Sequence, residues 1–203
     1  MISHPDPESI MNEINDDLHS KWGPEFNLDV DKKFEVLFLY NKKKNYFGIT
    51  DEGKLKITGT VVNRTSCPLY IRNKLMTAFE NILRGEWEEL RRIKSQIRLE
   101  IREQDIMDIA EWVRLSSTSP KVQTAHLKAA KNRLRLYRIP YHSGEKLPIV
   151  PTKVASIGYL AIHENIIDDL PEIDYDAVLA KWFYNPLKEI EDTLSQTNLS
   201  RFI

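Results

Sequence analysis

The hydrophobic and polar positions at the start of the chain predict a short amphipathic helix. Its apolar residues recur every four positions, at Ile10, Ile14, Leu18 and Trp22. This spacing places them on one side of a helix. Asp6 followed by Pro7 is typical of a helix start, and the pair Gly23 and Pro24 is typical of a helix end.

Three strands are predicted next. The segments "KFEVLFLY" and "KNYFGI" are rich in β-branched and aromatic residues, and "TDEG" separates the second of them from "KLKITGTVV". Gly53 within the separator can take a positive φ, which suits a tight turn. We therefore expect a small antiparallel sheet.

Helical periodicity returns after Pro68 and continues, with a break at Gly85, to about residue 101. Residues 105–115 fit a strand or a helix equally well. The segment "SSTSP" predicts a loop, and "KVQTAHLKAAKNRLRLY" after it predicts a helix. An extended stretch with three prolines follows, and "IDYDAVLAKWFYNPLKEIEDTL" predicts a helix with a kink or break at Pro186.

The order of these elements predicts an α+β fold. A small antiparallel sheet with a flanking helix comes first, and a mainly helical part follows. We place the domain boundary near residue 67, which gives one unit of residues 1–67, a second of residues 68–194 and a short tail of residues 195–203.

Composition predicts a soluble, cytoplasmic protein with no membrane contact. Cys67 is the only cysteine, which excludes an intrachain disulfide and a cysteine-rich zinc site and fits a reducing compartment. No apolar run approaches the roughly 20 residues of a membrane helix, and "MISHPDPESI" lacks the regions of a signal peptide.

The net charge of −1 conceals an uneven distribution of charges along the chain. The first thirty-five residues are mainly acidic. The middle of the chain is basic, with cations at Lys121, Lys128, Lys131, Arg133, Arg135, Arg138 and Lys146. This run fits a solvated helix face or a surface that binds phosphates, and charge alone leaves both open.

The residues of the chain predict neither a catalytic nor a metal-binding site. The five histidines are scattered, and no Gly-rich phosphate loop or nucleophile elbow is present. Two-metal phosphoryl transfer needs closely spaced carboxylates on a rigid sheet, and no predicted strand carries a closely spaced pair of aspartates.

The stretch "FEVLFLYNKKKNYFGITDEGKLKITGTVVNR" resembles the palm segment that follows the last catalytic aspartate motif of family B DNA polymerases. Lys43, Lys44, Asn45 and Tyr46 match the Lys-Lys-x-Tyr signature of that family. A turn, Gly59 and Arg64 follow at the family's spacing. "NRTS" departs from the Arg-Arg-Asp that family members often show, so only Arg64 carries over.

The resemblance extends through the thumb of the family and covers nearly the whole chain. "VQTAHLKAAKN" resembles its His-x-x-Ala-Ala-Lys segment, "SGEKLP" resembles a lysine turn, and "IDYDAVLAKWFYNPLKEIEDTL" resembles its final helix. The resemblance implies that residues 1–67 complete a palm and that residues 68–194 form a thumb. Each motif alone is weak, but their shared order makes the set specific.

The resemblance also implies a surface that holds duplex DNA without regard to sequence, through phosphates and the minor groove. On a strand, Lys44 and Tyr46 would face one side and Lys43 the other. Arg133, Tyr137 and Arg138 are assigned to surface or packing. The implied DNA-binding residues are Lys43, Lys44, Tyr46, Arg64, Thr124, His126, Lys128, Lys131 and Arg135. For His126, which is offset from the face of Lys128 and Lys131, a place in the core is the alternative. Taken alone, the lysines of the first group also fit a solvated strand edge.

The last residues have the spacing of a clamp-binding peptide of replication proteins. The residues concerned are Gln196, Leu199, Phe202 and Ile203. Residues three apart eclipse on a 3₁₀ turn, so one turn would present an apolar plug to a groove, with Gln196 at its rim. The alternative is an apolar tail that packs on its own domain.

These expectations together describe the non-catalytic small subunit of a split, archaeal-type family B DNA polymerase. The catalytic aspartates, the fingers helix and the exonuclease carboxylates would belong to a large partner subunit, which would hold the Mg²⁺, and no cofactor is expected on this chain. Primer-template DNA and a sliding clamp are the other expected partners. The alternatives are a stand-alone DNA-binding or clamp-binding accessory protein and a fragment of a longer polypeptide.

Overall fold

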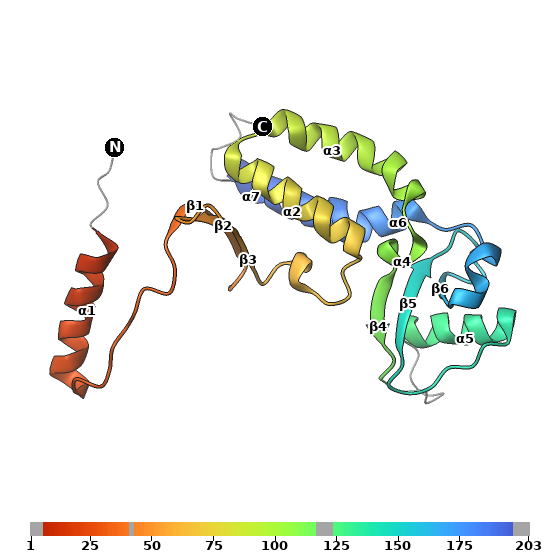
Figure 1. Ribbon diagram of the computed structural model, residues 1–203, viewed down its shortest axis with the longest axis horizontal. Helices are drawn as coiled ribbons and strands as arrows, with labels where there is room; N and C mark the ends of the chain where they lie inside the picture. The colour runs from red at the N-terminus through yellow and green to blue at the C-terminus, as the bar shows by residue number, and fades with distance from the viewer. Residues whose placement is uncertain (1–5, 41–42, 117–123, 197–203) are drawn as a thin grey trace.

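The computed structural model describes residues 6–40, 43–116 and 124–196 (Figure 1). The helices are α1 (Pro7–Trp22), α2 (Leu69–Arg84), α3 (Trp87–Glu100), α4 (Ile106–Ile109), α5 (Ala125–Tyr137), α6 (Tyr175–Leu179) and α7 (Asn185–Gln196). The strands are β1 (Phe34–Leu39), β2 (Tyr46–Thr50), β3 (Leu55–Thr58), β4 (Glu111–Arg114), β5 (Lys146–Pro151) and β6 (Tyr159–Ala161). The predicted α+β class is confirmed.

The first sheet is antiparallel with the order β1-β2-β3, as predicted. Gly53 has a φ of 74° in the turn between β2 and β3, as its sequence position predicted. Phe38, Phe47 and Ile57 pair across the three strands and face the same side. That side packs against α2, where the Phe47 ring stacks on Phe79 with centroids 4.5 Å apart. The opposite side of the sheet remains open for other contacts.

The main hydrophobic core joins this sheet to the helices that follow it. Helices α2 and α3 form a hairpin whose turn depends on Gly85, which has a φ of 71°. Leu75, Ile97 and Phe183 are fully buried in the same cluster as Phe47. The core therefore continues across residue 67, and the division into domains at that point stays a prediction.

A second antiparallel sheet, with the order β4-β5-β6, was not among the predicted elements. Its central strand β5 contains Pro148 and Pro151, and prolines ordinarily argue against a central strand. Helix α5 covers this sheet, and the two share a separate hydrophobic cluster that includes Leu127, Leu147 and Ile149. We call α5 and this sheet the tip module.

The C-terminal helix continues through Pro186 instead of breaking there. A π-helical segment, Ala180–Tyr184, joins α6 to α7. Proline removes one N–H and clashes with the preceding turn, and a wider π turn just before it accommodates the change. Within the π segment, the Lys181 Nζ lies 2.5 Å from a carboxylate oxygen of the buried Glu111. The C-terminal helix is thereby tied to β4.

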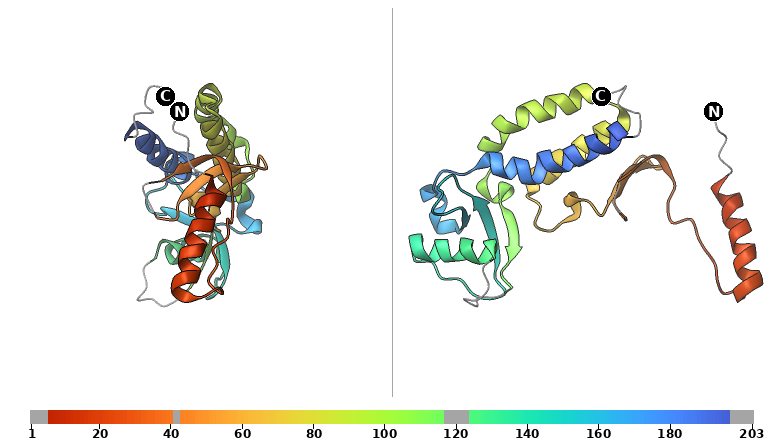
Figure 2. Two further views of the ribbon diagram at one scale, coloured as in Figure 1. Left: turned by 90° about the vertical axis from the view of Figure 1, so that its left-hand side faces the viewer. Right: turned by 180° about the vertical axis from the view of Figure 1, so that it is seen from behind.

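Helix α1 matches its predicted limits and stands apart from the rest of the molecule (Figures 1 and 2). Residues 23–33 connect it to β1. No helix in the described ranges is long and apolar enough to cross a membrane.

Candidate nucleic-acid interface

Lys43 and Lys44 lie in an exposed turn immediately before β2. Lys44 has a φ of 62°, in the left-handed region. Strand β2 begins only at Tyr46, so the strand alternation expected for Lys44 and Tyr46 is wrong. A side chain at Gly59 would collide with the Lys44 carbonyl and the Asn45 side chain, so this glycine allows the two segments to approach closely. The lysine pair is therefore held in a specific turn.

Tyr46 lies on the side of the first sheet that faces away from Phe47. It pairs with Leu39 and Thr58 across the strands, and its ring makes an edge contact with Phe34 at a centroid distance of 5.9 Å. Lys56 on β3 belongs to the same side because it pairs with Gly48, two residues after Tyr46. A tyrosine and a lysine thus share the open side of this sheet.

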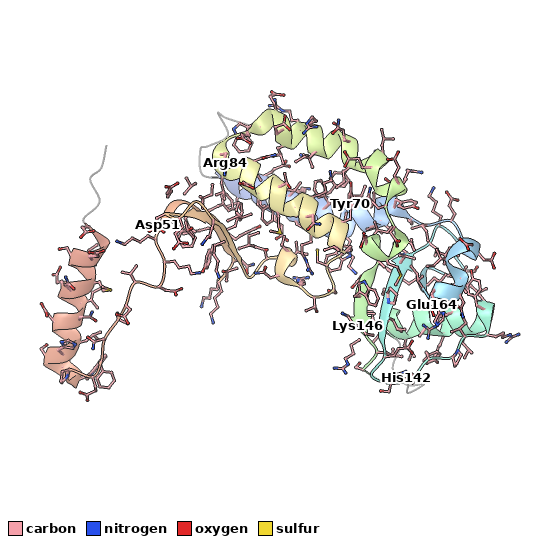
Figure 3. All side chains as sticks on the ribbon, in the orientation of Figure 1. Asp51, Tyr70, Arg84, His142, Lys146 and Glu164 are labelled. Carbon is pink, nitrogen blue, oxygen red and sulfur yellow. The ribbon has the colours of Figure 1, made fainter. Side chains whose placement is uncertain are left out.

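A cavity of about 650 Å³ lies between this sheet and the tip module. Its charged lining residues are Lys56, Arg72 and Lys146, which come from β3, α2 and β5. Figure 3 labels Lys146 at the start of β5, on the edge of the tip module nearer β3. Among the described residues no carboxylate lines the cavity. Three elements that are far apart in sequence therefore bring cations to one concave surface.

Two of these cations are held in place by neighbouring groups. The Arg72 Nη2 donates to the carbonyl of Arg64 at 2.9 Å. The Lys146 Nζ lies 5.2 Å from the centroid of the Trp112 ring, where a cation–π interaction restrains it. Both residues also line the cavity, and a lining with three cations suits an anionic ligand.

Arg64 itself lines a different, smaller cavity of about 200 Å³, together with Lys181, Asn185 and Tyr40. Burial and the charge of Glu189 raise the pKa of Tyr40, which keeps its hydroxyl neutral. The structure therefore separates Arg64 from the cavity that Lys56 lines, although its neighbours Asn63 and Thr65 line that cavity.

Helix α5 presents a second cationic surface. Lys128 and Lys131 line a cavity of about 590 Å³ with residues 155–159. The Asn132 Nδ2 donates to the carbonyls of Ile157 at 2.8 Å and Tyr159 at 2.9 Å, which fixes this turn against the helix. Within the described ranges this cavity also has no carboxylate in its lining.

The other residues predicted to bind DNA in and beside α5 do not line the cavity of Lys128 and Lys131. Thr124 precedes the helix as its N-cap, and its Oγ1 accepts from the Leu127 N–H at 3.2 Å. The Arg135 Nη2 donates to the Asn132 Oδ1 at 3.3 Å. His126 is half-buried and does not line the cavity of Lys128 and Lys131.

The chain is similar to known proteins both in sequence and in fold. Over 83 residues the chain is 31% identical to DNA polymerase 1 of Aeropyrum pernix, a match that covers 41% of this chain and 8% of that protein. The fold matches the structure of the family B DNA polymerase from the hyperthermophilic archaeon Pyrobaculum calidifontis. The TM-score is 0.60 at 20% identity, and the match covers 88% of this chain and 24% of that one.

This is the fold of part of a family B DNA polymerase. The similarity in sequence and the similarity in fold are both to archaeal DNA polymerases. No protein-family model matches it. The chain spans about a tenth of the length of the one relative and a quarter of the other.

Sequence reasoning missed the cavity lined by Lys56, Arg72 and Lys146. No local pattern connects these residues, because only the tertiary arrangement of β3, α2 and β5 brings them around one cavity. In the described part of the chain, no group of three or more His, Cys, Asp or Glu side chains could hold a metal ion.

Proposed function

We propose that the chain is the non-catalytic small subunit of a split family B DNA polymerase, and that it holds the primer-template duplex during DNA replication. The observation that carries the proposal is the cationic cavity between the first sheet and the tip module, whose described lining has no carboxylate, on a polymerase fold. Cations bind the phosphates of DNA and make no contact with base edges. Such contacts suit an enzyme that must bind every DNA sequence equally well.

In this proposal the duplex lies over the cavity lined by Lys56, Arg72 and Lys146 and contacts a further surface on either side of it. Lys43, Lys44 and Tyr46 contact it near the first sheet, and Lys128 and Lys131 contact it from the tip module. Arg64, Thr124, His126 and Arg135 are the further candidates. The large subunit supplies the aspartates and the Mg²⁺, so this chain contributes positioning, which is a major source of rate in phosphoryl transfer.

The test is co-expression with the polymerase chain of the same genome that carries the paired palm aspartates, followed by primer extension. The two chains are expected to purify as one complex. Lys44→Ala with Tyr46→Ala is expected to lower extension at least about tenfold by loss of duplex contacts, with assembly unchanged.

Lys54→Ala is the matched control, because Lys54 lies at the opposite end of β2 and is exposed beside Glu52. It is expected to extend primers at the rate of the unaltered complex. Failure of the two chains to co-purify contradicts the split-subunit proposal and favours a stand-alone accessory protein. Normal extension by the double variant contradicts the assigned role of the turn.

We also propose that the tail binds a sliding clamp. The support is the spacing of Gln196, Leu199, Phe202 and Ile203; Gln196 is the last residue of α7, and the other three lie outside the described residues. Tethering raises the effective concentration of the polymerase at the primer end without new contacts to DNA.

Deletion of residues 197–203 is therefore expected to remove most of the stimulation of long synthesis by the clamp. Synthesis on a short bare primer-template is expected to stay unchanged. A variant with a Gly-Ser segment of equal length in place of the tail controls for chain length. A fall in thermal stability of the truncated protein would instead place Phe202 and Ile203 in the core.

A further inference from the structure

The N-terminal arm, which we define as residues 6–33, is folded on itself and stands away from the main core (Figures 1 and 2). Asn15 exchanges two hydrogen bonds with the backbone of Leu28, at 2.9 Å and 2.7 Å. The Lys33 Nζ lies 2.6 Å from the Glu8 carboxylate. Contacts within the arm therefore give α1 and the segment after it a defined relative placement.

Large apolar side chains on the arm are exposed to an unusual extent. Trp22 is 63% exposed and makes an edge contact with Phe26, which is 49% exposed. Ile10, Ile14 and Leu28 are at least 40% exposed. Single exposed apolar residues are ordinary, but a group on one helix and its following segment marks a contact surface.

Strand β1, directly after the arm, also carries exposed large apolar side chains. It is an edge strand in the order β1-β2-β3, and no other described strand pairs with its free edge. Leu37 is 44% exposed and Leu39 is 63% exposed. A free edge with apolar side chains readily accepts another strand.

The charge of the arm restricts what can cover it. The arm is mainly acidic, with Asp6, Glu8, Glu13, Asp16, Asp17, Glu25, Asp29 and Asp31 against Lys21, Lys32 and Lys33. A nucleic acid and a second acidic arm are both disfavoured by repulsion. The complementary surface is a protein that offers an apolar groove with a basic rim.

We infer that the N-terminal arm and the free edge of β1 form one docking surface for the catalytic polymerase chain. The edge strand of that chain pairs with β1, and its apolar groove receives the side of α1 that carries Ile14 and Trp22. The inference rests on the proposed function, and it adds which part of this chain makes the interface and which surface of the partner it requires.

The experiment measures the affinity of the purified chain for the catalytic chain by isothermal titration calorimetry at two salt concentrations. Two variants are compared with the unaltered chain, Ile14→Asp with Trp22→Asp on α1, and Leu37→Asp with Leu39→Asp on β1. Each is expected to weaken binding at least about tenfold. Binding by the unaltered chain is expected to weaken as salt rises, because the contact is partly ionic.

Leu99→Asp is the matched control, because Leu99 is 71% exposed on α3, which is remote from the arm. It is expected to bind normally, and circular dichroism checks the fold of every variant. Normal affinity in both double variants overturns the inference while the unaltered complex still supports the proposed function. Absence of any complex overturns both. Self-association of the unaltered chain that the α1 variant abolishes also overturns the inference, since the surface then serves a second copy.

Discussion

Replacement of Glu145 by Gln is expected to lower the free energy of unfolding by about 3 kcal/mol. The Arg133 side chain is only 2% exposed, and its Nη2 lies 2.9 Å from the Glu145 Oε1 and 2.6 Å from the carbonyl of Pro140. Its Nε already has no partner among the described residues. Loss of the carboxylate would leave a buried cation without its counter-charge. Urea unfolding followed by circular dichroism measures the difference.

The effect of this substitution depends on pH. Burial alone would raise the pKa of Glu145, but hydrogen bonds from Arg133 and the His142 N–H, with the charge of Arg133, hold it below its ordinary value. The ion pair therefore stabilises the protein above the unfolded pKa of about 4.3, and this stabilisation is lost as pH falls through the lower folded value. The difference between the variant and the unaltered protein is expected to narrow below about pH 4.

Glu52→Gln is the matched control for Glu145→Gln. Glu52 also pairs with a cation, Lys54, but both side chains are more than two-thirds exposed. Exposed pairs contribute little to stability because water screens them. Equal stability of the two variants would show that the Arg133 guanidinium does not depend on Glu145.

The double variant Lys128→Ala, Lys131→Ala is expected to weaken duplex binding by the assembled polymerase roughly tenfold at physiological salt. The slope of log affinity against log salt concentration is expected to fall in magnitude by about 2, one unit for each lost phosphate contact. Both lysines line the cavity beside the turn of residues 155–159, with no carboxylate in the described lining. Fluorescence anisotropy with a labelled primer-template measures both quantities.

A control variant that loses two cations on another helix distinguishes a local contact with DNA from an effect of the net charge of the protein. Arg91→Ala with Arg98→Ala removes the same charge from α3, where Arg91 contacts Glu88 and Arg98 contacts Asp176. In Figure 1, α3 lies along the top of the molecule and α5 lies at the lower right, in the tip module. This variant is expected to keep the unaltered salt slope. Equal slopes for the two double variants would contradict an α5 contact surface.

Local sequence signals predicted the elements whose ends carry glycine or proline. The limits of α1 and the turn at Gly53 follow from prolines and glycines, which restrict or extend the range of conformations open to the backbone. The prediction was wrong where aromatic neighbours suggested a strand through Lys44, because that residue takes a left-handed conformation against Gly59. A tertiary contact decided the conformation there, and no local pattern reveals it.

The candidate site was predictable only where its residues share one element. Lys128 and Lys131 lie three residues apart on one helix, so periodicity places them together. Lys56 and Lys146 line one cavity because the tertiary fold places β3 and β5 on either side of it, with α2 between them in sequence. The sheet that contains β5 escaped prediction, since this central strand contains two prolines. The partner of Arg133 was equally hidden, twelve residues away on a different segment.

The two largest of the three hydrophobic clusters have a consequence for how the molecule would respond to its ligand. Phe47 and Phe183 belong to one cluster, and Leu127 and Leu147 belong to the other, with the Lys181 and Glu111 pair between them. A duplex held at both Lys56 and Lys128 would span the two clusters. Bound DNA would then connect the two clusters, and the midpoint of thermal unfolding is expected to be higher for the complex than for the free protein.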